Sequence, residues 1–144
     1  MGKLTRFYDR ESGQDGPVSG ALQMINLSLA TAAATNTTYI RQVHFPPGVG
    51  FEITDIRVWA GTVTSDPAIS VGTAAAGTQI VAAANLATGN QVLTIKDGTV
   101  AAGGLIDVRV VNDTGDAIAL GAQPPLTVNI FGYITSPPTS VPER

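Results

Sequence analysis

Two aspartates on predicted strands are the residues best suited to chemistry, because a glycosidase needs two carboxyl groups facing each other across a cleft. Asp55 and Asp107 both occupy the outward phase of their strands, and an arginine follows each at the second position, Arg57 and Arg109. Cross-strand ion pairing on a solvated face explains this pattern better than catalysis does, because surface ion pairs are common. The two carboxylates therefore rank low as a catalytic pair.

Other reactive constellations are incomplete. Residues 112–116, Asn-Asp-Thr-Gly-Asp, place oxygen ligands where calcium would fit, but they lack the spacing and closing glutamate of an EF-hand and are the usual formers of a tight turn. His44 is the single histidine, and no Gly-x-Ser-x-Gly elbow accompanies it. No cysteine is present, and no glycine-rich stretch matches a dinucleotide or phosphate loop. We expect no catalytic residues, no metal and no cofactor.

The composition narrows the range of partners. Charged residues make up only 13% of the 144-residue chain, about half the usual share, while hydrophobic residues reach 44%. The net charge is −3 and no stretch concentrates basic residues, so nucleic acid is not an expected partner. The longest weakly polar stretch, residues 21–34, is too short and too polar to cross a membrane, and we expect neither a membrane partner nor a secretory signal.

From residue 21 onward, short runs rich in Val, Ile, Leu and Thr alternate with turn residues, which is typical of an all-β domain of two packed sheets. A helix is the competing interpretation for residues 21–34. Asp97-Gly98 is the best hairpin candidate. The predicted strands are 21–29, 37–45, 51–60, 68–71, 79–82, 91–96, 105–112 and 126–134, with a possible short edge at 117–120.

The alternation of apolar and polar residues is cleanest in 105–112 and 126–134, where every second side chain is apolar. In 51–60 the apolar side chains that should face the core fall on odd-numbered positions in the first half of the strand and on even-numbered positions in the second half. An extra residue near Thr54 and Asp55 would explain the change, and we predict a β-bulge there. The inward residues on the two sides of this point are Phe51 with Ile53, and Ile56 with Val58.

The predicted domain, residues 21–134, has an appendage at each end. Residues 1–20 end in Gly and Pro and have no stable period, so they form an extended arm. A solvated terminus is the plain interpretation, but the mix of aromatic and charged residues favours docking on a partner. Residues 135–144 form a Pro-rich tail. The candidate docking residues of the arm are Lys3, Arg6, Phe7, Tyr8, Asp9 and Arg10.

Two features point to contacts between chains. The segments 73–78 and 81–87 are rich in Ala and Gly or Thr, and such weakly polar loops are expected to be covered by other subunits. Trp59, the sole tryptophan, would anchor an interface, stack on a sugar ring or lie between the sheets. We assign Trp59 and Tyr133 as candidate oligomer contacts.

Three runs resemble a known family: ITDIRV at 53–58, ISVGTAAAGTQIVAA at 69–83 and LTVNIFGYI at 126–134. They are similar to small β-sandwich virion proteins of tailed bacteriophages, and most similar to capsid decoration, or cement, proteins. The resemblance covers about residues 50–134. Related "Ser-Val-Gly-Thr" sandwiches also occur in phage tail and fibre proteins.

The resemblance implies a jelly-roll-like β-sandwich of about eight strands. It also implies a structural protein, commonly a homotrimer, on the outer surface of the virion's capsid. There the arm would bridge neighbouring subunits of the major capsid protein. A tail or fibre protein and a carbohydrate-binding attachment module remain open as alternatives. The aromatic content of 6% is low for a carbohydrate-binding module, which needs exposed aromatic residues in its groove. A hydrolase ranks lowest among the alternatives.

Overall fold

The computed structural model describes residues 21–29, 37–113, 116–118 and 126–135, and every structural statement below concerns these residues. The predicted arm and its six candidate docking residues lie outside them, as does the predicted tail apart from Thr135.

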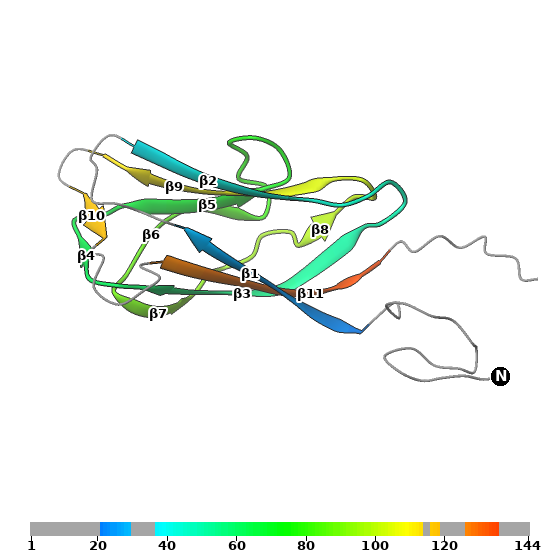
Figure 1. The fold of residues 1–144 in the computed structure, drawn as a ribbon, viewed down its shortest axis with the longest axis horizontal. Coiled ribbons are helices and arrows are strands. Elements are labelled where there is room, and N and C mark those ends of the chain that lie inside the picture. The colour runs from blue at the N-terminus through cyan, green and yellow to red at the C-terminus, as the bar shows by residue number, and fades with distance from the viewer. Residues whose placement is uncertain (1–20, 30–36, 114–115, 119–125, 136–144) are drawn as a thin grey trace, which may run out of the picture.

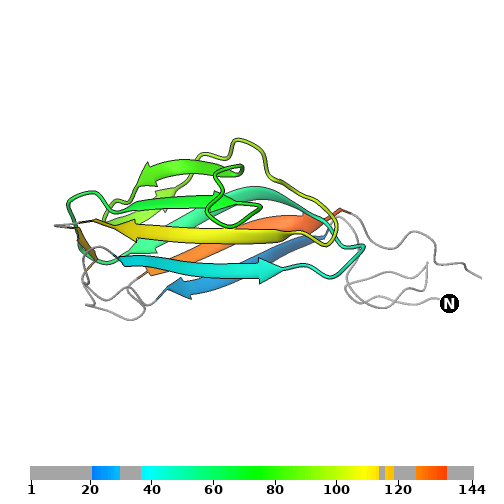
Figure 2. The ribbon, with the colours of Figure 1, turned by 90° about the horizontal axis from the view of Figure 1, so that it is seen from above.

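The described chain forms two antiparallel sheets that face each other as the layers of a β-sandwich (Figure 1), and two short strands, β4 and β10, pair as a separate two-stranded sheet. Sheet A has the strand order β1-β11-β3-β7, with β8 also paired to β3, and sheet B has the order β2-β9-β5-β6. Figure 2 looks onto sheet B. The all-β prediction is confirmed. The strands are β1 (Leu22–Leu29), β2 (Thr37–His44), β3 (Phe51–Ala60), β4 (Val63–Thr64), β5 (Ala68–Gly72), β6 (Val81–Asn85), β7 (Gly89–Val92), β8 (Thr99–Val100), β9 (Leu105–Asn112), β10 (Ala117–Ile118) and β11 (Leu126–Ile134).

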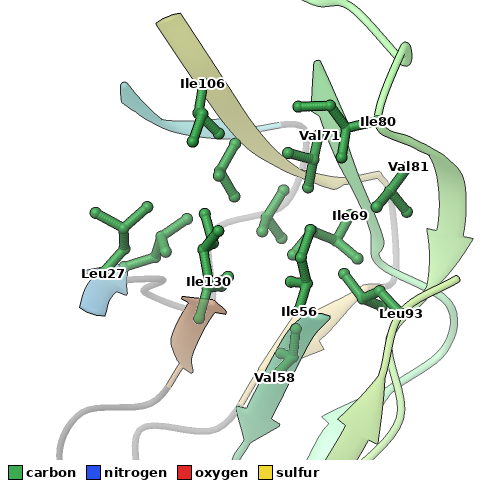
Figure 3. Close-up of a cluster of buried hydrophobic side chains, with 14 of the residues drawn as sticks. Leu27, Ile56, Val58, Ile69, Val71, Ile80, Val81, Leu93, Ile106 and Ile130 are labelled. Carbon is green, nitrogen blue, oxygen red and sulfur yellow. The ribbon is translucent and has the colours of Figure 1, made fainter. Parts of the chain in front are cut away.

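The inner faces of the two sheets meet in one hydrophobic core, part of which Figure 3 shows. The alternation predicted for β9 and β11 is confirmed, because their apolar positions are buried on the inner face. Burying an aliphatic side chain of this size contributes about 1.5–3 kcal/mol. The labelled core residues are Leu27, Ile56, Val58 and Ile130 of sheet A, Ile69, Val71, Val81 and Ile106 of sheet B, and Ile80 and Leu93 outside the strands.

The predicted β-bulge is present in β3. Asp55 pairs with Phe131 of β11 and Ile53 pairs with Gly132, so Thr54 is the extra residue. This insertion lets the buried positions on both sides of the bulge face the same core, although their spacing breaks the two-residue period. Gly132 lies opposite the bulge, and the ring of Phe51 and the carbonyl oxygen of Glu52 occupy the space where a Cβ would lie.

The hairpin predicted at Asp97-Gly98 is wrong. β7 and β8 do not pair with each other, because both pair with β3, at its two ends. The segment between them crosses the side of the sandwich: the amide of Leu93 donates to Ile56 of sheet A (3.0 Å), and that of Lys96 donates to Ile80 (2.7 Å). Gly98 lies against β3, where its carbonyl oxygen accepts the amide of Ile53 (2.8 Å). This glycine therefore permits a close backbone approach.

Other predicted boundaries differ in detail. Residues 22–29 form a strand, so the helical alternative is wrong there, and residues 30–34 lie outside the described part. The two-residue strands β4 and β8 are absent from the prediction, which also places β6 too early and β7 too late. These short elements contain few apolar positions, so their periodicity is too weak to fix a boundary.

The first and last strands of the described chain are neighbours in sheet A. Leu22, at the start of β1, pairs with Tyr133, near the end of β11. Phe51, at the start of β3, pairs with Ile134. The chain therefore enters and leaves the sandwich at one end, which we call the terminal pole (Figure 1).

We predict that Gly132→Ala lowers the free energy of unfolding by more than about 2 kcal/mol, because the new methyl group collides with backbone and a packed ring. Gly48→Ala is the matched control. Gly48 has a φ of 85°, but no atom lies within 4 Å of the point that a Cβ would occupy, so only the backbone conformation is penalised, by about 1–2 kcal/mol. Urea unfolding measures both variants. Equal losses would show that the close approach at the bulge does not constrain the fold.

Candidate functional site

The two aspartates that the sequence singled out lie on opposite outer faces of the sandwich. Asp55 is on the outer side of β3 in sheet A, and Asp107 is on the outer side of β9 in sheet B. The core separates them, so they cannot flank one glycosidic bond. Each aspartate instead pairs with the arginine two residues along its own strand. The predicted cross-strand pairing is therefore wrong for both.

Asp107 is not on a solvated face as predicted, because its side chain is fully buried. Its carboxylate accepts hydrogen bonds from Arg109 Nε (2.8 Å) and from Gln42 Nε2 of the neighbouring strand (2.6 Å). The other neighbouring strand, β5, presents Gly72 opposite Asp107. Gly72 has no side chain, so the loop after β5 packs directly on it, and the backbone of Ala76 adds a hydrogen bond to the carboxylate.

Burial by itself raises the pKa of Asp107, because it penalises the charged form. The hydrogen bonds from Arg109 and Gln42, the positive charge of Arg109 and the hydrogen bond from the Ala76 backbone together outweigh that penalty. The pKa of Asp107 therefore lies below its usual value. The site holds a structural ion pair that fastens the 73–78 loop to sheet B.

The remaining chemical candidates also make structural contacts. The carboxylate of Asp116 is buried and accepts the amides of Asp113 (2.8 Å) and Asp66 (3.2 Å). The amide of Asp116 donates to the carbonyl oxygen of Asp113, which favours the turn interpretation over a calcium loop. His44 is exposed, and its Nε2 lies 3.2 Å from Oε1 of Gln42. No group of three or more potential metal ligands occurs among the described residues.

The outer face of sheet A carries an apolar cluster at the terminal pole, which we call the apolar patch. Leu22 and Met24 of β1 are 69% and 56% exposed, and they lie opposite Tyr133 and Phe131 of β11. Single exposed apolar residues are ordinary, but a contiguous group that includes two half-buried aromatic side chains is a candidate interaction surface. Of this group, Tyr133 alone was singled out from the sequence, because the patch exists only through the pairing of strands from the two ends of the chain.

Trp59 lies on the same outer face, toward the other end. It belongs to β3 and is half-buried, so the interpretation that placed it between the sheets is wrong. Its partner on β11 is Thr127, six positions before Tyr133, so Trp59 and Tyr133 are about 20 Å apart along the sheet. The two candidate oligomer contacts therefore do not form one cluster.

A hollow of about 400 Å³ adjoins Trp59. Strands β3, β7 and β11 contribute its lining: Arg57, Val58, Trp59, Asn90, Gln91, Val92 and Asn129. A smaller hollow of about 270 Å³ lies beside the Ala-rich β6 and includes Ala82, Ala83 and Lys96. In both segments that the sequence assigned to subunit contacts, alanines are exposed, namely Ala74, Ala75 and Ala76 in one and Ala82, Ala83 and Ala87 in the other.

We predict that Asp107→Asn lowers the free energy of unfolding by about 3 kcal/mol at neutral pH, because the carboxamide places an NH₂ donor among the donors of Arg109 and Gln42. Asp55→Asn is the matched control: its pair with the 62% exposed Arg57 should contribute less than about 1 kcal/mol.

The same contacts predict that the free energy of unfolding depends on pH. A carboxyl group whose pKa is lowered by folding stabilises the fold above its unfolded pKa, near 4, and this stabilisation is lost as the pH falls further. Urea titrations from pH 7 to pH 2 should show that Asp107→Asn removes part of this acid sensitivity. Indistinguishable acid profiles for Asp107→Asn and Asp55→Asn would contradict the assignment.

No helix in the part of the chain that the structure describes has the length and apolar character needed to cross a membrane.

Comparison with known proteins gives no family assignment. No protein-family model and no curated protein matches the sequence.

Proposed function

We propose that the chain is a structural protein of a tailed-phage virion that binds the outside of the capsid and bridges neighbouring capsomers. The observation that carries this proposal is the terminal pole. The described part of the chain begins and ends at this pole, and the apolar patch lies there on the outer face of sheet A. The arm and the apolar surface would thus act on one partner together.

The chemistry of the described residues supports a role in binding. The carboxylates Asp107 and Asp116 are occupied by protein hydrogen bonds, and His44 contacts an amide rather than a nucleophile or an acid. The low charge suits a surface that packs against other protein subunits, because the cores of such interfaces are depleted of charged residues.

The strand order supports the jelly-roll part of the proposal. Numbered one to eight along the chain, the eight longer strands give the orders 1-8-3-6 in sheet A and 2-7-4-5 in sheet B.

Trimerisation would add multivalency, because three arms on one assembly bind a repetitive shell far more tightly than a single arm does. We propose that the apolar patch, which includes Tyr133, contributes to the contact between copies or to the contact with the shell.

The location on the virion gives the first test. We expect quantitative mass spectrometry of purified particles to find about as many copies of this chain as of the major capsid protein, because a decoration protein covers the whole shell. A few copies per particle would instead place it in the tail, portal or fibre. Complete absence from the particles would contradict a virion role.

The arm gives the second test. We expect deletion of residues 2–20 to weaken binding to particles that lack the chain by at least about tenfold, because the arm supplies the multivalent grip. Deletion of residues 136–144, at the same pole, is the matched control and should leave binding intact. Co-sedimentation measures binding, and thermal unfolding checks that both truncated domains fold. Undiminished binding without residues 2–20 would overturn the arm model.

A further inference from the structure

The hollow beside Trp59 combines one aromatic residue with several amide groups and an arginine. Arg57 and Trp59 come from β3, Asn90 from β7 and Asn129 from β11. Strand pairing fixes their relative positions, because Trp59 lies opposite Asn90, and Arg57 lies opposite both Asn129 and Val92. A site built on three paired strands is held more rigidly than one built on loops.

Two polar side chains around the hollow, Arg57 and Asn129, are held by hydrogen bonds and retain further hydrogen-bonding capacity. Asp55 accepts from Nε of Arg57 (2.7 Å), which leaves the terminal guanidinium nitrogens as donors. Asn26 donates to Oδ1 of Asn129 (2.6 Å), which leaves the Nδ2 of Asn129 as a donor. Asn90 is exposed.

Gln91 has a different role. Its carboxamide accepts the amide of Ala87 (3.0 Å) and donates to the carbonyl oxygen of Asn85 (3.0 Å). Both ends of this side chain are therefore used within the protein. The contacts fasten the turn before β7 and so fix the strand that carries Asn90 and Val92.

These features match the chemistry of a sugar. A pyranose has an apolar face of C–H bonds that packs on an aromatic ring, and hydroxyl groups around its edge that both donate and accept hydrogen bonds. Trp59 with Val92 supplies an apolar floor, while Asn90, Asn129 and Arg57 supply polar groups at the edge. A volume of about 400 Å³ lies within the range of small-molecule sites, about 300–1,000 Å³.

The charge of the site selects among sugars. The cation that lines the hollow, Arg57, is already paired with Asp55, so the pair presents no net charge to a ligand. An anionic sugar at the remaining guanidinium donors would gain little net attraction, because Asp55 already neutralises the charge of Arg57. We propose that this hollow binds a neutral pyranose unit of an oligosaccharide. This binding does not require that the chain be part of a virion.

The experiment uses the full-length chain and a panel of soluble oligosaccharides, neutral ones of glucose, galactose, mannose or N-acetylglucosamine and acidic ones with uronic or sialic acid. Trp59 is the only tryptophan, so intrinsic fluorescence reports directly on the site. We expect a saturable change with at least one neutral oligosaccharide, and isothermal titration calorimetry to give the same dissociation constant. No saturable binding to any neutral member, or binding to acidic members only, would overturn the proposal.

Variants locate the binding. We expect Trp59→Ala to weaken affinity by at least about tenfold in calorimetry, and Asn90→Ala by about fivefold, because each removes one contact to the sugar. Trp59→Phe, which keeps an aromatic ring, should restore most of the affinity and guards against a folding defect. Thr99→Ala is the control, because it changes an exposed side chain of β8 beside the other end of β3, and it should bind normally. Equal affinity in Asn90→Ala and the parent, or a loss in Thr99→Ala as large as in Trp59→Ala, would place the ligand elsewhere.

Discussion

The pairing of β3 with β11 is the constraint on which the rest of sheet A depends. Side chains of a strand alternate between its two faces, so a slip of one residue would exchange the core and the surface along the whole strand. The extra residue Thr54 corrects the phase within β3. Phe51 and Val58 therefore both enter the core, while Glu52 and Trp59, on the two sides of the bulge, both face outward. The surface chemistry of this sheet is thus a consequence of one irregularity in its central ladder.

The two Asp-x-Arg sequences show how burial changes the role of one motif. Asp55-x-Arg57 and Asp107-x-Arg109 have the same spacing, and in each the arginine Nε donates to the aspartate, at 2.7 and 2.8 Å. The first pair stays on an open face beside a hollow. A neighbouring strand and a returning loop cover the second, and there Gly72 permits the loop to approach the sheet. The surroundings of the motif therefore decide whether it stabilises the fold or borders a site.

Local pattern was enough to predict much of the fold from the sequence, because alternation and turn residues act over a few positions. Strands 51–60, 105–112 and 126–134 have the predicted bounds, and the bulge falls where the phase changes. The burial of Asp107 escaped prediction because Gln42 and Ala76, which cover it, are distant in the sequence. The hairpin at Asp97-Gly98 failed because β3 is long enough to pair with two successive strands along one edge.

The candidate surfaces were also hard to predict, because each combines residues that are distant in the sequence. The apolar patch joins residues from β1 and β11, and the hollow joins residues from β3, β7 and β11, so neither exists in any one stretch of sequence. Trp59 and Tyr133 were both found by residue type, yet they belong to different surfaces about 20 Å apart on one face. The patch lies at the pole where the terminal segments join the domain, and no residue is shared with the hollow. A protein surface bound at the pole would therefore leave the polar groups beside Trp59 free for a second ligand.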